Sequence, residues 1–512
     1  MKKFFSRFTV VAAVIFLLPL FMNAQSKKPN VIIIYVDDLG YGDLGVTGAK
    51  GVKTPNLDRM AANGLLFTDG HCHASTCTPS RYSLLTGNYA FRNKAAILPG
   101  DAPALITEGT PTIASTLKRA GYHTAVIGKW HLGLGTGNIN WNGYINMGPK
   151  EIGFDYSFLI PATGDRVPTV YTENQRVVNL DPKDPIQVSY EKKIGNRPTG
   201  TENPELLKMK ADLQHSNTIV NGVSRIGFMG GGESALWKDE DFSLVFTQKA
   251  KEYITANKNN PFFLYFAFQD IHVPRVPHPD FAGKSSMGPR GDAIVQMDHY
   301  TGELIKTLDS LGIAENTLVI FSSDNGPVLD DGYDDKAVEM LGEHKPAGPF
   351  RGGKYSAFEA GTRVPTIAYW PSKIKPGVSD ALFTQVDIYH SVSKLAGIKL
   401  NHNEALDSFD ALPVLLGKDK KGRKYIIEEA FTLALRVGDW KYIHPVSMST
   451  PQWLDHKKVE SALSKQVQLY NLKADPAEKN NIAAKHPKKV IKMQALLEEI
   501  KQGNTRKAQT VQ

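Results

Sequence analysis

Two short runs of oxygen-bearing side chains could bind a metal ion. Asp37 and Asp38 form one run, and Asp324 and Asn325 form the other. Carboxylate and amide oxygens are hard ligands, which suit calcium or magnesium better than zinc. A single acidic pair usually caps a helix or faces solvent. If the two runs meet, however, their carboxylates repel one another, and a divalent cation would relieve that repulsion.

Residues 77–81, with the sequence Cys-Thr-Pro-Ser-Arg, offer a nucleophile. A thiol at Cys77 could be activated by Arg81 and by the N-terminus of a following helix. A small buried thiol in a loop is the alternative interpretation of an isolated cysteine. Cys72 is the other cysteine of the chain, and we interpret it as a buried thiol. A disulfide between the two would close a short loop and would stabilise a chain of this length very little.

Four uninterrupted apolar runs predict the strands that position these polar residues. The runs cover residues 31–36, 123–127, 262–268 and 317–321. They are followed by Asp37 and Asp38, by residues 128–131, by residues 269–272 and by residues 322–326. Continuous hydrophobicity is typical of strands buried on both faces, as in a parallel sheet covered by helices. Functional groups gather at the carboxyl ends of the strands in such sheets, so we expect the four polar segments to meet.

Helical patterns lie between the predicted strands. Two begin at Thr-Pro steps, at residues 54–55 and 110–111, and end near Gly64 and Gly121. Longer amphipathic helices are predicted over residues 239–256 and 291–311. The alternation of strand and helix predicts an α/β fold, with a large, mostly parallel sheet sandwiched by helices.

The pattern changes along the chain in two places. Residues 140–235 show weak periodicity with several Gly, Pro and Asn residues, which indicates an insertion or long loops over the active face. After about residue 420, short strands are predicted at residues 425–427, 432–437, 440–443 and 468–472, followed by a helix over 486–500. We therefore predict a catalytic domain over residues 25–420 and a smaller C-terminal α+β subdomain with an antiparallel sheet over 421–512.

The N-terminal pattern predicts a signal peptide over residues 1–24. Basic residues precede an apolar run over residues 8–21, which is short for a membrane span of about 20 residues. An uncleaved anchor is the alternative, and no second run is long enough to span a bilayer. The signal predicts export to the periplasm or the cell exterior, with no stable membrane insertion after cleavage.

The composition of the chain limits the classes of protein to which it could belong. The chain has 512 residues, of which 41% are hydrophobic and 22% charged, so global disorder is unexpected. Cleavage after residue 24 removes three basic residues and no acidic one, so the net charge falls from +8 to +5. This excess would mildly attract anionic substrates. It forms no basic stripe of the kind that indicates a nucleic-acid partner.

Five motifs in order resemble the type I formylglycine-dependent sulfatases, the arylsulfatase-like family of the alkaline phosphatase superfamily. Residues 77–81 and 85–87 are similar to the motif whose cysteine is oxidised to formylglycine. The remaining motifs are similar to residues 37–42, 128–133, 323–326 and 351–354, and residues 469–478 resemble the final domain of the family. The resemblance spans about residues 29–485. It implies an alkaline-phosphatase-like fold and hydrolysis of sulfate esters.

The resemblance also implies the cofactors. A separate maturation enzyme would convert Cys77 to formylglycine (3-oxoalanine), and one geminal hydroxyl of its hydrate would attack sulfur. One calcium ion per subunit would be held by five groups, namely Asp37, Asp38, Asp324, Asn325 and the formylglycine made from Cys77. Calcium would polarise the nucleophile and the sulfate. Sulfate would then leave as the aldehyde re-forms, so sulfur is attacked only once.

The remaining catalytic roles follow from the same resemblance. Arg81 and Lys129 would stabilise the ionised diol, and Lys354 would contact sulfate oxygens as a point charge. His272 is the candidate acid for the leaving alcohol, and His131 the candidate base that regenerates the aldehyde.

The predicted substrate is a sulfated carbohydrate, with the sugar and the sulfated position left open. Candidate pocket residues in loops are Asp101, Asp165, Arg166, Arg275, His278 and His344. Three alternatives remain at this point: a phosphonate or phosphate-ester hydrolase on the same scaffold, a non-catalytic glycan-binding relative, and a thiol enzyme that uses unmodified Cys77.

Overall fold

A ten-stranded sheet forms the centre of the computed structural model, which describes residues 28–457, 459–503 and 505. Five parallel strands make its middle, in the order β13 (Thr317–Ser323), β1 (Asn30–Val36), β12 (Phe262–Ala267), β4 (His123–Lys129) and β5 (Tyr156–Ile160). In β1, Val31 pairs with Phe263 on one side and with Leu318 on the other. The four predicted strands are confirmed as neighbours in a mostly parallel sheet.

Antiparallel strands join this middle on both sides. On one side lie β14 (Thr366–Tyr369), antiparallel to β13, then β2 (Leu65–Phe67) and β15 (Gly377–Ser379). On the other side β5 continues into the short strands β6 (Thr172–Glu173) and β7 (Arg176–Val177). The sheet is therefore mixed at its flanks.

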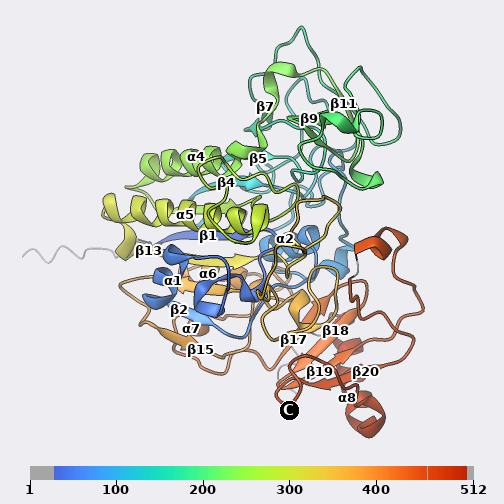
Figure 1. The fold of residues 1–512 in the computed structure, drawn as a ribbon. Coiled ribbons are helices and arrows are strands. Elements are labelled where there is room, and N and C mark those ends of the chain that lie inside the picture. Colours follow the sequence, from blue (N-terminus) through green and yellow to red (C-terminus); the bar gives the residue numbers. More distant parts are fainter. Residues whose placement is uncertain (1–27, 458, 504, 506–512) are drawn as a thin grey trace, which may run out of the picture.

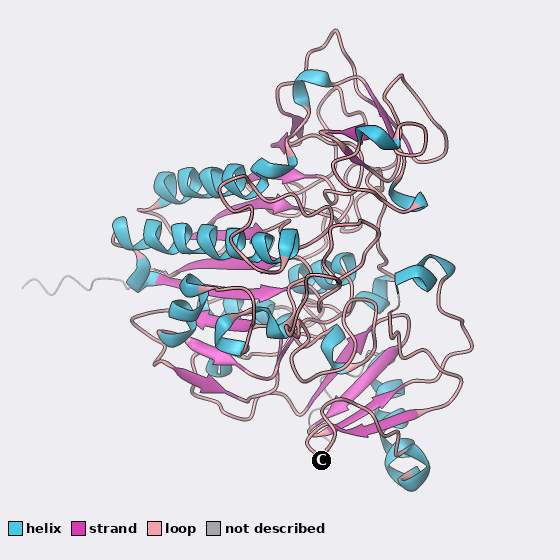
Figure 2. Ribbon diagram, in the orientation of Figure 1, coloured by secondary structure: helices cyan, strands magenta, loops and turns pink. Residues whose placement is uncertain are grey.

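Helices cover both faces of the sheet, and the side chains of β1 show why the sequence is continuously apolar. Val31, Ile33 and Tyr35 pack into one core, while Ile32 and Ile34 pack into the other. The first core is covered by α2 (Cys77–Thr86), α3 (Ile113–Arg119), α6 (Ile388–Leu395) and α7 (Leu412–Leu415). The second core is covered by α1 (Pro55–Ala62), α4 (Phe242–Asn257) and α5 (Gly288–Ser310). Figure 2 shows α4 and α5 lying side by side along the strands.

The predicted helices are confirmed with small shifts at their ends. The segment predicted over 239–256 begins as a 3-10 turn at Asp239–Asp241 and continues as α4, and the segment predicted over 291–311 is α5, which begins three residues earlier. The two Thr-Pro segments form α1 and α3.

A four-stranded antiparallel sheet forms the C-terminal part of the described chain. Its order is β17 (Tyr425–Glu429), β18 (Leu433–Val437), β19 (Trp440–Ile443) and β20 (Gln468–Asn471). The helix α8 (Pro487–Lys501) packs on it through Met493, Leu497 and Ile500. The predicted α+β arrangement is confirmed.

Residues 140–235 are mostly loops, as predicted, but the strands within this range were missed. The strand β5 lies within this range and belongs to the central sheet, so the expectation of loops alone is wrong there. The other short strands are β8 (Gln187–Ser189), β9 (Ile219–Val220), β10 (Val223–Ser224) and β11 (Phe228–Gly230), and the pair β3 (Gly70–His71) and β16 (Phe383–Thr384) lies elsewhere. In Figure 1 the part around β9 and β11 lies at the top and the four-stranded sheet at the bottom.

The predicted signal peptide, residues 1–24, lies outside the described residues. Within the described part of the chain, no helix is both long and apolar enough to cross a bilayer.

Candidate active site

The carboxyl ends of the parallel strands bring the predicted site residues together. Asp37 and Asp38 follow β1, and Asp324 and Asn325 follow β13. The amide of Asp38 donates to Asp324 Oδ1 at 3.3 Å, and Asn325 Nδ2 donates to Asp38 Oδ1 at 2.7 Å. The two acidic runs meet because β1 and β13 are neighbours in register, with Val36 opposite Ser323.

Two oxygens of this cluster are left without a hydrogen-bond donor. Asp37 Oδ1 and Asn325 Oδ1 are buried and accept no hydrogen bond from any described residue. A buried polar atom without a partner costs free energy, so such atoms usually mark a bound ion, water or ligand. Ligand atoms of Asp37, Asp38 and His272 also lie within 4.8 Å of one another. The donor set, mostly carboxylate and amide oxygens, therefore fits a hard divalent cation.

The electrostatics of these carboxylates also favour a bound cation. Burial, and then the negative charge of Asp324, raises the pKa of Asp37 to about 6, although Lys129 and Arg81 oppose the shift. Burial likewise raises the pKa of Asp38, against the opposing charge of Lys354. Protein cations alone leave these carboxylates incompletely compensated, and a metal ion would complete the compensation.

Cys77 is the first residue of α2, and its side chain is buried. Its Sγ lies 3.2 Å from His131 Nδ1, while the Thr78 hydroxyl donates to the His131 carbonyl at 3.0 Å. Every residue of α2 is buried, so the helix start is held firmly on the sheet. Burial raises the pKa of the Cys77 thiol, although Lys129 and Lys354 oppose this. The site therefore does not favour a free thiolate at this position.

Arg81 and Lys129 neutralise the inner carboxylates. Arg81 donates to Asp324 Oδ2 through Nε at 3.0 Å and through Nη2 at 2.7 Å. Lys129, the last residue of β4, forms an ion pair with Asp37. The preceding residue, Gly128, has φ +112°, and a Cβ there would meet the Ala267 carbonyl at 1.9 Å. Only glycine lets β4 and β12 approach so closely at the point where Lys129 leaves the sheet.

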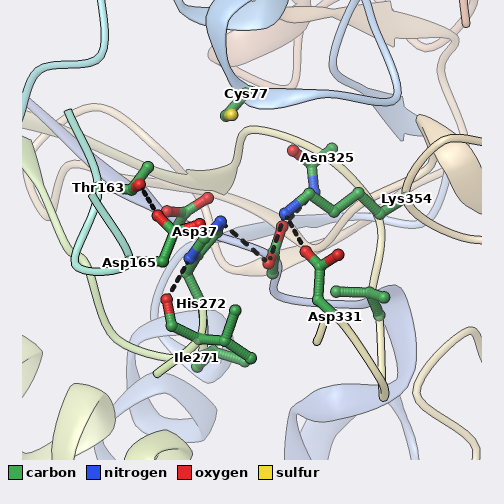
Figure 3. A network of polar contacts seen from close by, with 12 residues as sticks. Asp37, Cys77, Thr163, Asp165, Ile271, His272, Asn325, Asp331 and Lys354 are labelled. Carbon is green, nitrogen blue, oxygen red and sulfur yellow. Dashed lines mark hydrogen bonds and ion pairs between the residues drawn. The ribbon is translucent and has the colours of Figure 1, made fainter. Parts of the chain in front are cut away.

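Lys354 reaches the cluster from the opposite side. Its Nζ donates to Asp38 Oδ2 and to Asp331 Oδ2, both at 2.9 Å. Asp331 also accepts from the Tyr355 hydroxyl at 3.1 Å and pairs with Lys457 Nζ at 2.8 Å. Burial opposes ionisation of Asp331, but Lys354 and then Lys457 hold its pKa well below its usual range. Asp331 is therefore ionised, and its carboxylate fixes the position of Lys354 (Figure 3).

The hydrogen bonds of His131 define its tautomer. Nε2 lies 2.8 Å from the Leu98 carbonyl, which can only accept, so Nε2 carries the proton. Burial, and then the positive charge of Lys129, lowers the pKa of His131 well below its ordinary value. The neutral ring therefore presents an unprotonated Nδ1 to residue 77, as a base requires.

His272 lies on the other side of the cluster, after β12. Its Nδ1 donates to the Val273 carbonyl at 2.6 Å, and its Nε2 lies 4.0 Å from Asp38 Oδ2. Burial, and then the charges of Lys354 and Lys129, lowers the pKa of His272 well below its ordinary value. In the neutral ring Nε2 carries no proton, so donation to a leaving group would require the imidazolium form.

A cavity of about 280 Å³ opens onto these groups. Cys77, His131, His272, Asp331 and Lys354 line it. Figure 3 shows Cys77 on one side of this space, with His272 and Asp331 across from it. The predicted nucleophile, both histidines and the predicted anion-binding lysine thus share one pocket.

Two of the six predicted pocket residues lie here. Asp165 and Arg166 line the cavity, and Arg166 Nη1 donates to Asp165 Oδ1 at 2.7 Å. The expectation was wrong for four others, Asp101, Arg275, His278 and His344, which do not line this cavity.

The structure assigns two of those four to structural contacts. Arg275 Nη1 donates to Asp335 Oδ2 at 2.7 Å, and its other nitrogens bond backbone carbonyls. His344 Nε2 lies 2.7 Å from Asp43 Oδ1. Both side chains are buried among their partners, and a single sequence gave no means of separating such residues from pocket residues.

Several lining residues were not predicted. They are Ile97, Leu98, Pro99, Tyr190, Gln214, His215, Ile226, Tyr355, Trp453 and Lys457, together with Asp331. Asp331 follows Asp330, and an isolated acidic pair carried no signal by itself. His215 lies in the weakly periodic region, and Trp453 and Lys457 lie in the C-terminal part, where only strands and a helix were expected. Cys72 is buried and free, as interpreted from the sequence.

Comparisons with known proteins give a consistent result. The family model described as Sulfatase matches residues 29–398. The chain is 52% identical over 484 residues to an N-acetylgalactosamine-6-O-sulfatase of Bacteroides thetaiotaomicron, covering 94% of each chain. It is 31% identical to human arylsulfatase A, covering 90% of this chain and 84% of that protein. A solved structure from work on glycosaminoglycan metabolism by Bacteroides thetaiotaomicron superposes with a TM-score of 0.91 at 52% identity, covering 93% of this chain and 100% of that one.

Proposed function

The chain belongs to the sulfatase family and is a sulfatase, and on that premise we propose that it removes the 6-sulfate of N-acetylgalactosamine in a sulfated glycan. The support is the 52% identity, over 94% of both chains, to a protein with that named activity. The cavity adds physical support, because it places Lys354 and Arg166 beside the uncharged rings of His131 and His272. Such a pocket suits a sugar that carries one anionic group.

We propose that the nucleophile is a formylglycine made from Cys77 by a maturation enzyme. The Cys77 sulfur occupies the place that the oxygens on Cβ would take after conversion. A hydrated formylglycine supplies two geminal hydroxyls, one to attack sulfur and one whose deprotonation releases the sulfate. The contact between Cys77 Sγ and His131 Nδ1 supports this assignment, as does the burial that disfavours a thiolate.

Asp37, Asp38, Asp324 and Asn325 would hold a calcium ion, together with residue 77. The buried and unpartnered oxygens of Asp37 and Asn325 are the observation that supports a metal here. The ion would supply positive charge to polarise the nucleophile and to neutralise the sulfate.

The position of each side chain in the site determines the role that we propose for it. Lys354 and His272 would contact sulfate oxygens, because both line the cavity and both approach Asp38. Arg81 and Lys129 would balance the charge beneath residue 77. His131 would accept the proton of a residue 77 hydroxyl at Nδ1. The negative charge of a bound sulfate would favour the imidazolium form of His272, which would then protonate the leaving sugar oxygen.

The observation that carries the proposal is that Cys77 and an unprotonated imidazole nitrogen share one pocket, which Lys354 joins to a cluster with unpartnered oxygens. The test is sulfate release by protein whose conversion at position 77 is confirmed by peptide mass. The substrates are N-acetylgalactosamine 6-sulfate, its 4-sulfate, galactose 6-sulfate and N-acetylglucosamine 6-sulfate. We expect release from the first that a calcium chelator abolishes.

The same experiment separates the alternatives. Turnover of phosphonate or phosphate esters without sulfate release would favour the hydrolase on the same scaffold. Full activity of protein with unconverted Cys77 would favour a thiol enzyme, and binding of sulfated sugars without any turnover would favour a glycan-binding relative. Release from a different sugar of the panel would keep the class and overturn the proposed substrate.

We also propose that residues 25–420 form the catalytic domain and 421–512 a C-terminal subdomain, since β17 to β20 form a sheet of their own. Export to the periplasm or the cell exterior remains part of the proposal, supported by the basic and apolar pattern of residues 1–24. Cleavage between residues 24 and 25 can be read from the N-terminal sequence of protein recovered after secretion.

A further inference from the structure

One wall of the catalytic cavity comes from the C-terminal part of the chain. The 3-10 helix η11 (Gln452–Lys457) contributes Trp453 and Lys457 to the lining that also contains Cys77 and His272. In Figure 1 the C-terminal part, coloured orange to red, extends from the four-stranded sheet toward the catalytic domain. Nothing in the mechanism described above uses Trp453.

Trp453 lies at the outer end of the cavity. Its residue is 36% exposed, whereas Cys77, His272 and Lys354 are each 4% exposed or less. The indole makes edge contacts with the Tyr355 ring, 5.1 Å between centroids and at 82°, and with the Phe431 ring, 6.3 Å between centroids and at 69°. A ring held by two aromatic neighbours, and still open to the cavity, presents a fixed apolar surface to whatever extends out of the pocket.

Lys457 fixes this wall to the catalytic centre. Its side chain is 3% exposed, and its Nζ pairs with Asp331 Oδ1 at 2.8 Å. The other oxygen of Asp331 accepts from Lys354 at 2.9 Å. The segment that carries Trp453 is therefore joined, through one buried carboxylate, to the lysine that we place on the sulfate.

The size of the cavity limits what the inner end can hold. About 280 Å³ lies near the lower end of ligand pockets, which span roughly 300–1,000 Å³, so one sulfated sugar fills it. Any further sugar of the glycan must lie outside, over the rim where Trp453 is exposed. The charged groups lie at the buried end, so the rim favours the apolar face of a pyranose ring over a second anion.

We propose that Trp453 is a specificity-determining residue that stacks on the sugar next to the sulfated one, so that the enzyme binds sulfated oligosaccharides more tightly than the sulfated monosaccharide. This inference rests on the proposed function, since it assumes a sulfated sugar in the inner pocket. The ligand at the rim is an uncharged or weakly charged pyranose ring.

The test compares a sulfated monosaccharide with the disaccharide that carries one further sugar, using matured enzyme. In the wild type we expect a lower KM for the disaccharide. In Trp453→Ala the KM for the disaccharide should rise about tenfold, with kcat within about twofold and with monosaccharide turnover unchanged. Trp453→Phe keeps an aromatic face and should recover most of the difference.

A matched control and a second readout keep the inference falsifiable. Met448 is another exposed apolar residue of the C-terminal part, 50% exposed, and it does not line the cavity. Met448→Ala should leave both KM values unchanged. Affinities are also measured by calorimetry with unconverted protein, in which the sugar binds without turnover.

The outcomes separate the two proposals. Equal loss of monosaccharide and disaccharide turnover in Trp453→Ala would mean a structural role and would overturn the inference. Unchanged disaccharide KM and affinity would overturn it as well. Absence of sulfate release by the wild type from every sugar would instead overturn the proposed function, and disaccharide affinity weakened by Trp453→Ala would then still support a sugar-binding rim.

Discussion

Two clusters of buried charge differ in how the protein's own cations are placed among their carboxylates. The active-site cluster consists of Asp37, Asp38, Asp324, Asn325, His272, Arg81, Lys129 and Lys354. The interface cluster lies between the central sheet and the C-terminal sheet and consists of Asp69, His71, Glu359, Glu428, Glu478, Arg363, Arg436 and Lys441. In both clusters, three side chains bring metal-binding atoms within 4.8 Å of one another.

Arg436 occupies the position in the interface cluster that a metal ion could take. Its Nη1 lies 2.6 Å from Asp69 Oδ1, 2.9 Å from Glu359 Oε1 and 3.1 Å from His71 Nε2. Lys441 completes the charge balance, 2.7 Å from Glu428 Oε2. A planar guanidinium with several donors satisfies the acceptors that a metal ion would otherwise share.

Among the described residues, the active-site cluster has no arginine or lysine in the corresponding position. Arg81 and Lys129 bind Asp324 and Asp37 from one side, yet Asp37 Oδ1 and Asn325 Oδ1 accept no hydrogen bond from any described residue, and Arg81 Nη2 approaches Asp37 Oδ1 only to 3.9 Å.

The interface cluster also has two oxygens without a hydrogen bond, Glu428 Oε2 and Glu478 Oε1, but both face Lys441 Nζ, at 2.7 and 3.8 Å. Carboxylates alone therefore do not identify a metal site. What distinguishes the catalytic cluster is that no described arginine or lysine joins its three metal-binding side chains, whereas Arg436 joins those of the interface cluster.

The largest effect is expected where the active-site cluster meets the nucleophile. Cys77→Ala removes the group that becomes formylglycine, so we expect sulfate release to fall at least about 10⁴-fold. The melting temperature should change little, because the smaller side chain also removes a buried polar group. Activity is measured as released sulfate, and stability by thermal unfolding.

The other cysteine is the matched control. Cys72 is buried and donates to the carbonyls of Ala74 and Thr362, both at 3.2 Å, outside the cavity. Cys72→Ala should keep sulfate release within about threefold, since it alters packing and weak thiol hydrogen bonds outside the cavity. If Cys72→Ala lost activity as completely as Cys77→Ala, the assignment of the nucleophile would be wrong.

The second effect concerns the metal ion that the unpartnered oxygens imply. Asp37→Asn removes one charged ligand, and we expect sulfate release to fall about 10²–10³-fold. Calcium should raise the melting temperature of the wild type, since saturation at 100 times Kd stabilises the folded state by about 2.7 kcal/mol. Asp37→Asn should lose most of that rise.

A matched substitution in the interface cluster tests whether the calcium effect belongs to the active-site cluster alone. Asp69→Asn removes a carboxylate that Arg436 and His71 bind, so it should lower stability while leaving the calcium-dependent rise and sulfate release intact. If calcium stabilised the wild type and Asp37→Asn equally, the ion would bind elsewhere and the contrast between the clusters would fail.

The third effect is on stability alone. Arg436→Met leaves Asp69 and Glu359 buried without their main partner, so we expect a loss of about 3–5 kcal/mol in the free energy of unfolding. Sulfate release by the folded enzyme at 25 °C should stay within about twofold. Denaturant unfolding gives the free energy, and Arg59→Met on the exposed side of α1 should change it by no more than about 0.5 kcal/mol.

The sequence predicts the centre of the fold because burial on both faces leaves a strong local signal. The strands β1, β12 and β13 are uninterrupted apolar runs, and the residues that follow them are polar because they leave the sheet at its functional edge. The strands β14 and β2 are short and antiparallel, and nothing local separates them from loop segments. The contact of Cys77 with His131 follows only once both are placed at the same sheet edge.

Residues that act through distant partners could not be found in this way. Asp69 and Arg436 are 367 positions apart. Lys457 lies in the 3-10 helix η11 and Asp331 in the long segment between β13 and β14, so no spacing relates these pairs. Asp331 fixes Lys354, but a single aspartate beside another carries no motif. Charge pairing across a fold depends on the tertiary structure, whereas a strand and its terminal residues are encoded side by side.

The smallest effect tests how the interface cluster responds to pH. Burial raises the pKa of Glu478 to about 8, and the carboxylate of Glu359 adds to the shift against the opposing charge of Lys441. The folded state therefore keeps a proton on Glu478 between its ordinary pKa of 4.5 and about 8, where the unfolded state has lost it. Stability from this group is full below about pH 4.5 and is lost as the pH rises through 8.

Glu478→Gln mimics the protonated carboxyl at every pH, because the amide oxygen can still accept from the Glu359 amide, a bond of 2.6 Å to Glu478 Oε2. We expect the melting temperature of the wild type to fall by a few degrees between pH 6 and pH 9 and that of Glu478→Gln to fall less. Glu499→Gln, a change on helix α8 outside both clusters, should keep the wild-type slope. Parallel slopes for the wild type and Glu478→Gln would mean that Glu478 is ionised at neutral pH. The interface cluster would then carry one more negative charge, and its two arginines and one lysine would face four carboxylates instead of three.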